Sequence, residues 1–436
     1  MNIFVLLPLL LHVIEISALF TPTTPPFYPL YPLKSTNPLS SFSLRSTNPS
    51  NYNVPPVENG ATVTPNPAYN RKKQLRTFSR YLEVESWRGG TESRNLETVL
   101  ASVGKACQQI SRLIARAATD DIYGVATNPD GTPLEDNVQG EVQQKLDVVC
   151  NKIMMNAFCG CSNDVAAIAS EEEDAPRLCS DLLQTNSISI GDYVAVFDPL
   201  DGSKNIDSSL PVGTIFGIYK YKTHGPAGVT TFLQKGDNLV AAGYCLYSAT
   251  TILVLTLGGG RVDGFTLDPD RGEFLQTHPD MRIPTSGPLV CFNEANYREF
   301  EAPVRRYLSN VKSDGVEDLT RKSIVEPEGG LKPRKFKVSC RYVGAMVADV
   351  HNVLVQGGIY GYPKTKNNPS GKLRLLYESN PMGMIIEQAG GAASTGHGRI
   401  LEVVPTEIHQ RVPTYCGSVE NIFELEQFFK YYRDED

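Results

Sequence analysis

Hydrophobic positions along this chain follow a helical period in four places. In residues 96–114 the apolar residues recur at three- and four-residue intervals, which predicts a long amphipathic helix. Residues 141–158 predict a second helix of the same kind. In the second half, residues 343–355, which end at two glycines, and residues 422–432 predict two more helices.

Short apolar runs separated by turn residues predict a set of strands between these helices. The predicted strands are residues 165–169, 193–197, 214–219, 239–247, 252–257, 262–267 and 289–292. Helices interleaved with clustered strands predict a layered α/β fold that begins near residues 71–77. We expect a domain boundary near residue 280, which gives an N-terminal domain over 71–280 and a C-terminal domain over 281–436.

The N-terminal region has a different composition. Residues 3–14 form a mostly apolar run that is too short to span a bilayer, and Ser17 and Ala18 follow it, so residues 1–18 are expected to be a signal peptide. Residues 20–57 contain no Asp or Glu, which predicts a disordered, transit-peptide-like segment over 19–70. Together these segments predict delivery to the plastid stroma, with plain secretion as the alternative.

Composition narrows the classes of function. The chain has 436 residues with a formal net charge of −7 and no dense basic stripe, which argues against a nucleic-acid partner. No other stretch is apolar enough to cross a membrane. Nine cysteines without framework spacing predict mostly reduced thiols, and Cys159 and Cys161 lack a matching pair for zinc.

Two carboxylates in one Pro/Gly turn are the strongest chemical signal in the chain. Asp198 and Asp201 follow the predicted strand 193–197, and side by side in apolar surroundings they need a neutralising cation. Their hard oxygen atoms favour Mg²⁺ or Mn²⁺. Gly202 and Ser203 offer backbone N–H groups and a hydroxyl to a phosphate oxygen. The turn therefore predicts metal-assisted phosphate chemistry, with an ordinary acidic turn as the alternative.

Other charged groups gather in two regions. The acidic run 171–174 follows the predicted strand 165–169 and can reach the same sheet edge as Asp198, where ligands of open α/β sheets collect. In the second half, residues 340–342, 360–362 and 371–378 combine cations with tyrosines, which suits a second phosphate or sugar hydroxyls. For each segment the alternative is an exposed loop.

Five motifs taken in order resemble the fructose-1,6-bisphosphatases. They are residues 171–174, 198–207, 341–351, 371–378 and 405–413, and the resemblance extends from about residue 77 to about residue 433. It implies a layered α-β-α-β-α fold with two mixed sheets and, usually, a homotetramer. It also implies hydrolysis of the 1-phosphate of fructose 1,6-bisphosphate with Mg²⁺, for which Mn²⁺ can substitute.

The resemblance also implies roles for individual residues. The implied metal ligands are Glu171, Asp198, the carbonyl of Leu200, Asp201, Glu378 and, near a third metal position, Glu141. The residues implied in catalysis are Asp147 and Glu172, which help to deprotonate the attacking water, together with Glu171. The implied substrate contacts are Gly202, Ser203, Asn293, Arg341 from a neighbouring subunit, Tyr342, Gly344, Met346, Tyr362, Lys372 and Arg374.

Departures from the family pattern leave alternatives open. Lys204 stands where a serine is usual, and a catalytically silent, sugar-phosphate-binding subunit is the alternative that it supports. Sedoheptulose 1,7-bisphosphate is the alternative substrate, alone or alongside the fructose ester. Residues 94–97 and Asp192 replace the segments that bind AMP in animal members, which predicts weak or absent AMP inhibition. Cys150, Cys159, Cys161 and Cys179 are expected to be core thiols, with a redox switch as the alternative.

Overall fold

The computed structural model describes residues 75–89, 91–120, 122–127, 144–160, 164–183, 191–221, 227–312 and 337–432. Lys72–Asp436 form one compact unit, distinct from Met1–Arg71. The expected signal peptide (1–18) and transit-like segment (19–70) lie outside the described residues. Within the described ranges, no helix combines the length and the apolar character needed to cross a bilayer.

Three helices precede the first long strands. They are α1 (Phe78–Gly89), α2 (Thr91–Ala115) and α3 (Lys145–Gly160). The predicted amphipathic helix is confirmed as α2, whose Val99, Val103 and Ile110 are fully buried along one stripe. Helix α3 confirms most of the second predicted helix. Helix α1 has no counterpart among the predicted elements.

The first sheet has eight strands in the order β2-β1-β3-β4-β5-β6-β7-β8. Their bounds are β1 (Val165–Ser170), β2 (Arg177–Leu178), β3 (Tyr193–Asp201), β4 (Val212–Lys220), β5 (Leu239–Tyr247), β6 (Thr251–Thr256), β7 (Asp263–Asp268) and β8 (Glu273–His278). Strands β1 and β3 run parallel and the other neighbours antiparallel, so the sheet is mixed. Every residue of β1 and β3 is buried, as a strand covered on both faces requires. Short helices α4 (Cys179–Leu182) and α5 (Val229–Phe232) flank it.

The second sheet has five strands in the order β10-β9-β11-β15-β13. Their bounds are β9 (Leu289–Phe292), β10 (Ser339–Cys340), β11 (Gly358–Tyr362), β13 (Ala392–Ser394) and β15 (Thr414–Gly417). Strands β10, β9 and β11 are parallel, whereas β15 runs antiparallel to both β11 and β13. A separate two-stranded ladder pairs β12 (Leu373–Arg374) with β14 (Arg411–Val412). This sheet is therefore also mixed.

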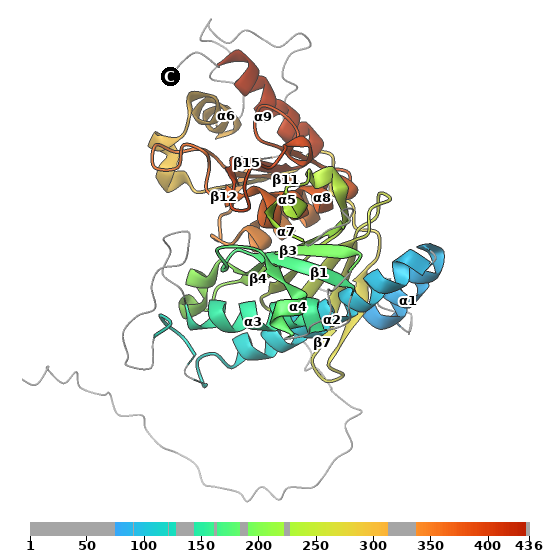
Figure 1. Cartoon of the computed structure of the whole chain (residues 1–436). Coiled ribbons are helices and arrows are strands. Elements are labelled where there is room, and N and C mark those ends of the chain that lie inside the picture. Colours follow the sequence, from blue (N-terminus) through green and yellow to red (C-terminus); the bar gives the residue numbers. More distant parts are fainter. Residues whose placement is uncertain are drawn as a thin grey trace, which may run out of the picture. The chain divides into compact units, whose positions relative to one another are not determined.

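Helices and sheets alternate in five layers (Figure 1). Helices α2 and α3 cover the outer face of the first sheet, and α7 (Met346–Gln356) and α8 (Asn380–Gln388) lie between the two sheets. Helices α6 (Ala302–Lys312) and α9 (Val419–Tyr431) cover the far face of the second sheet. The expected α-β-α-β-α fold with two mixed sheets is confirmed. The first sheet ends at His278 and the second begins at Leu289, and the domain boundary near residue 280 stays a prediction.

Helix α7 begins three residues later than the sequence pattern predicts. The carboxylate of Asp349 accepts the N–H groups of Val343, at 3.0 and 3.1 Å, and of Gly344, at 3.2 Å. Gly344 has a φ of 89°, which is not helical and favours glycine. These contacts hold residues 343 and 344 outside the helix, so α7 begins at Met346.

One disulfide joins the end of α3 to the start of α4. Cys159 and Cys179 are bonded across 20 residues, with their Cα atoms 5.0 Å apart. The expectation of core thiols is therefore wrong for these two residues, because both helices pack against β1 and bring their ends together. Cys150 is a buried free thiol, and Cys161 lies outside the described residues.

Candidate active site

A cavity of about 330 Å³ opens where the carboxyl ends of β1 and β3 meet the N-terminus of α7 and the β12 segment. The predicted site residues that line it are Asp147, Glu171, Glu172, Asp198, Leu200, Asp201, Gly202, Ser203, Asn293, Tyr342, Gly344, Met346, Tyr362, Lys372, Arg374 and Glu378. Segments that are far apart in the chain therefore line the same cavity.

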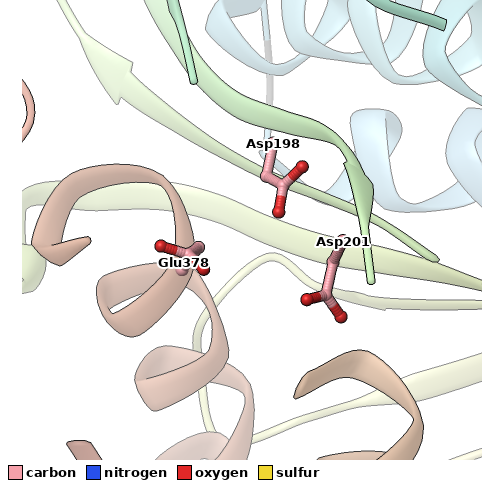
Figure 2. Close-up of side chains that lie close together, drawn as sticks. All are labelled: Asp198, Asp201 and Glu378. Carbon is pink, nitrogen blue, oxygen red and sulfur yellow. The ribbon is translucent and has the colours of Figure 1, made fainter. Parts of the chain in front are cut away.

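Three buried carboxylates form the floor of this site. Asp198, Asp201 and Glu378 each offer a ligand atom, and these atoms lie within 4.8 Å of one another. Figure 2 shows the two aspartates at the end of one strand, facing the helical turn η6 (Leu375–Ser379) that carries Glu378. Three carboxylates at this spacing form a set of hard oxygen donors that fits a divalent cation such as Mg²⁺ or Mn²⁺.

An irregularity in β3 lets both aspartates contribute to the same cluster. Side chains three residues apart in a regular strand point to opposite faces, but the β3–β4 register shifts between Asp198 and Asp201. The side chain of Asp198 accepts the N–H of Leu200 at 2.9 Å, which closes a local turn around Pro199. The bulge thus allows Asp198 and Asp201 to contribute to one carboxylate cluster at the end of β3.

Gly202 directly follows β3, and no larger residue fits at this position. Its φ is 77°, and a Cβ atom at this position would lie 2.5 Å from the Cβ of Ala345. The close approach brings the turn against the N-terminus of α7, where Asp201 accepts the N–H of Val347 at 2.7 Å. Asp201 therefore lies at the positive end of a helix dipole as well as in the carboxylate cluster.

Burial raises the pKa values of these acids. Desolvation raises the pKa of Asp201 to about 7, although hydrogen bonds from the N–H groups of Val347 and Met346 lower it in part. Desolvation, partly offset by Arg374, raises the pKa of Glu378 to about 8. The pKa of Asp198 is also raised, first by burial and then by the charge of Glu171. Without a cation the cluster holds protons, as expected of acids arranged to bind a metal.

Arg374 is the cation inside this acidic cluster. Its Nη1 lies 2.8 Å from Oε1 of Glu171 and 4.0 Å from Oε2 of Glu378. Its backbone N–H also donates to Oε2 of Glu378 at 2.5 Å. The arginine is almost fully buried, so it orients two of the predicted ligands. A direct contact with substrate stays a prediction for this residue.

A second group of acids lies beside the metal cluster. Glu171 and Glu172 follow β1, and the N–H of Glu171 donates to the carbonyl of Phe197 at 3.1 Å, which ties the acidic run to β3. Asp147 lies in the first turn of α3 and accepts the N–H of Gln144 at 2.9 Å. Burial raises the pKa of Asp147 to about 7, and the nearby charge of Glu172 adds to that rise. An acid with this pKa can accept a proton near neutral pH.

The opposite wall carries tyrosines and a methionine. Tyr342 and Tyr362 both line this wall, and burial raises the pKa of Tyr342, so its hydroxyl stays a neutral donor. Tyr360 and Leu373 line the cavity in addition to the predicted residues. Tyr360 belongs to the motif 360–362, so its residue type was a signal that could have identified it. Neutral hydroxyl donors of this kind suit a sugar.

Three further residues complete the comparison with the predicted set. Lys204 lines the cavity on its exposed side. Arg341 is exposed, donates to the carbonyl of Cys340 at 3.1 Å and does not line the cavity of its own chain. Glu141 lies outside the described residues.

Family models match nearly the whole described unit. The model for the N-terminal domain of fructose-1,6-bisphosphatase matches residues 77–279, and the model for its C-terminal domain matches residues 283–430. These two ranges cover both sheets and the cavity between them.

Individual relatives give the same result. The chain is 41% identical over 384 residues to a chloroplastic fructose-1,6-bisphosphatase of Brassica napus, covering 84% of this chain and 85% of that protein. It is 41% identical over 379 residues to the chloroplastic enzyme of Spinacia oleracea, covering 81% and 83%. The crystal structure of Leishmania major fructose-1,6-bisphosphatase in holo form superposes with a TM-score of 0.70 at 34% identity, covering 82% of this chain and 99% of that chain.

Proposed function

The chain belongs to the fructose-1,6-bisphosphatase family, and on this premise we propose that it hydrolyses the 1-phosphate of fructose 1,6-bisphosphate to fructose 6-phosphate and phosphate. One observation carries the proposal: Asp198, Asp201 and Glu378 converge in a cavity. The same cavity is lined by tyrosine and lysine side chains, which can donate hydrogen bonds to a sugar phosphate. Enzymes of this family are hydrolases that act on phosphate monoesters.

We propose Mg²⁺ as the resident cation, with Mn²⁺ as a substitute. Glu171, Asp198, Asp201, Glu378 and the carbonyl of Leu200 would hold it, and Glu141 would serve a further position. When bound, the cation neutralises phosphate charge and lowers the pKa of a coordinated water. The fit of three buried carboxylates within 4.8 Å of one another supports this assignment.

Proton removal from the attacking water would fall to Asp147 and Glu172. Both side chains line the cavity, and a pKa of about 7 makes Asp147 a base of suitable strength at neutral pH. Its carboxylate is held by the N–H of Gln144, so it is oriented before substrate arrives.

The sugar and the 6-phosphate would lie against the opposite wall. Asn293, Tyr342, Tyr362 and Lys372 would contact them, with Met346 and Gly344 against the ring. Family enzymes are generally oligomeric, and we propose a homotetramer in which Arg341 of a neighbouring subunit completes the phosphate site. The exposed position of Arg341 in its own chain is compatible with this arrangement.

We also propose that the protein acts in a plastid. Two relatives at 41% identity are chloroplastic enzymes, and residues 1–70 have the composition of a bipartite targeting segment. A reporter fused to residues 1–70 that is secreted, rather than delivered to the plastid, would contradict this proposal.

Phosphate release from purified protein tests the activity. We expect Mg²⁺-dependent release from fructose 1,6-bisphosphate, loss of that release in EDTA, and a loss of at least 100-fold in Asp198→Asn. A matched control is Glu387→Gln, a carboxylate that pairs with Arg399 outside the cavity and should leave activity unchanged. Faster release from sedoheptulose 1,7-bisphosphate would favour the alternative substrate, and no release from either ester would favour a regulatory subunit.

A further inference from the structure

The segment 405–413 is a family-like motif whose function the cavity does not explain. None of its residues lines the described cavity. It is nevertheless tied to the site, because β14 near its end pairs with β12, which carries Arg374. The carbonyl of Gln410 also accepts the N–H of Leu375 at 2.7 Å, at the first residue of the turn that carries Glu378.

His409 lies at the centre of this segment and forms a bridge. Its Nδ1 lies 2.8 Å from the hydroxyl of Tyr377, and its Nε2 lies 3.1 Å from the carbonyl oxygen of Glu173. A carbonyl can only accept, so Nε2 carries the proton and donates. In the neutral ring, Nδ1 is then the acceptor for the O–H of Tyr377. One imidazole thus satisfies both partners with a defined tautomer.

The two partners of His409 belong to the two segments that carry the proposed ligands. Glu173 directly follows Glu171 and Glu172, at the end of β1. Tyr377 directly precedes Glu378, in the turn η6. Because these segments are far apart in the sequence, their spacing depends on tertiary contacts. The imidazole connects the backbone of the first segment to a fully buried side chain of the second.

We propose that His409 is a positioning residue for the metal site, fixing the separation of the 171–173 run from Glu378 through Glu173 and Tyr377. This inference rests on the proposed function only in taking the carboxylate cluster as a metal site. Groups one shell behind the ligands typically change metal affinity by about 10- to 100-fold when they are removed. A bridge between two ligand-bearing segments belongs to this class.

Mn²⁺ binding measured directly, without turnover, tests the proposal. The free ion is counted by electron paramagnetic resonance as it is titrated into full-length wild type, His409→Phe, His409→Gln and Tyr377→Phe. We expect His409→Phe, which keeps a ring but loses both hydrogen bonds, to weaken Mn²⁺ binding about 10-fold. Tyr377→Phe should weaken it in the same direction. His409→Gln keeps a donor that can reach Glu173 and should recover part of the affinity.

The double variant His409→Phe/Tyr377→Phe should bind Mn²⁺ no more weakly than the worse single variant, because both remove the same bridge. At saturating metal, the KM for fructose 1,6-bisphosphate should change less than about twofold, since the sugar wall is untouched. A rise in KM with unchanged Mn²⁺ affinity would overturn the proposal.

A second tyrosine–histidine pair provides the matched control. The hydroxyl of Tyr244 on β5 lies 2.7 Å from Nδ1 of His351 on α7, and neither residue lines the cavity. Tyr244→Phe should therefore cost stability of the same kind and leave Mn²⁺ affinity unchanged. If Tyr244→Phe and Tyr377→Phe lower the thermal midpoint equally and neither changes Mn²⁺ affinity, His409 is merely structural and the proposal fails.

Two outcomes separate this inference from the proposed function. Wild type that binds no Mn²⁺ and releases no phosphate would overturn the metal site and this inference with it. Wild type that binds Mn²⁺, together with His409→Gln and Tyr377→Phe that bind it equally well, would overturn this inference alone. Because these two variants are conservative, they decide the question even if His409→Phe does not fold.

Discussion

The guanidinium of Arg374 lies 2.8 Å from the carboxylate of Glu171, and only 4% and 12% of the two side chains are exposed. The same arginine lies 4.0 Å from Glu378, one of the three clustered carboxylates. A buried cation among acids that we propose as metal ligands does two things. It lowers the cost of collecting the acids, and it orients two of them before the metal arrives.

Replacing Arg374 by methionine should lower the free energy of unfolding of the metal-free protein by about 3–5 kcal/mol, because Glu171 is left buried without its partner. Urea denaturation in EDTA measures the loss, and added Mg²⁺ should recover part of it. The control is Arg399→Met, whose guanidinium is 38% exposed and pairs with Glu387 and Asp237. There we expect about 1 kcal/mol. Equal losses in the two variants would contradict the special role of Arg374.

Metal removal should make stability depend on pH in a defined direction. Burial raises the pKa of Asp201 from 3.8 to about 7 and that of Glu378 from 4.5 to about 8. Between the ordinary and the raised values the folded state carries more protons than the unfolded state, so stability falls as pH rises through this window.

Thermal midpoints measured from pH 5 to pH 9 test this dependence. In EDTA the midpoint should fall with rising pH and level off above about pH 8. With saturating Mg²⁺ the fall should be reduced or reversed, because the cation replaces the protons. Parallel profiles with and without Mg²⁺ would mean that the cluster does not bind the ion.

Local patterns in the sequence predicted the elements near the site better than the contacts between them. The long apolar runs of β3, β4 and β5 and the stripe of α2 are strong periodic signals, and all four elements are confirmed. The turn at Asp198 was also predictable from local sequence, because its Pro, Gly and Asp residues act within a few positions of one another.

Contacts made by very short elements had no such signal. Strands β12 and β14 have two residues each, yet their pairing helps to place Arg374 and Glu378. The late start of α7 relative to the predicted pattern depends on Asp349, whose side chain accepts the N–H groups of residues 343 and 344. The Cys159–Cys179 bond likewise depends on two helix ends meeting at β1, and periodicity does not encode that meeting.

The Cys159–Cys179 bond should stabilise the segment that carries Glu171 and Glu172. It closes a loop of 20 residues around β1, and loops of this size typically gain about 3 kcal/mol from a disulfide. Cys159→Ser should lower the free energy of unfolding by about this amount. Dithiothreitol should destabilise the wild type similarly and have no effect on Cys159→Ser. An equal effect of the reductant on both proteins would place the sensitive bond elsewhere.

Lys204 should strengthen substrate binding without being essential for hydrolysis. It is an exposed cation on the cavity wall, next to Ser203 in the predicted phosphate turn. Lys204→Ser should raise the KM for fructose 1,6-bisphosphate about fivefold, or about 1 kcal/mol, with kcat little changed. High salt should shrink the difference, because an exposed charge is screened. Inactive wild type that Lys204→Ser restores would show instead that the lysine blocks the site.

AMP should inhibit this protein weakly. Asn95 on α2 donates to Asp192 at 2.8 Å, so the two segments that the family resemblance links to AMP do meet, and they meet with a carboxylate. A second acid, Glu97, lies on the same helix. Negative charge at this position repels a phosphate. We therefore expect half-inhibition only above about 1 mM AMP, which corresponds to a binding free energy no stronger than about −4 kcal/mol.

Initial rates at saturating Mg²⁺ with increasing AMP measure the inhibition. Asp192→Lys should bring half-inhibition to lower AMP concentrations, because it replaces a repulsive charge with an attractive one, whereas Asp192→Ala should have a smaller effect in the same direction. Strong inhibition of the wild type by micromolar AMP would contradict the prediction and would indicate a nucleotide site away from Asn95 and Asp192.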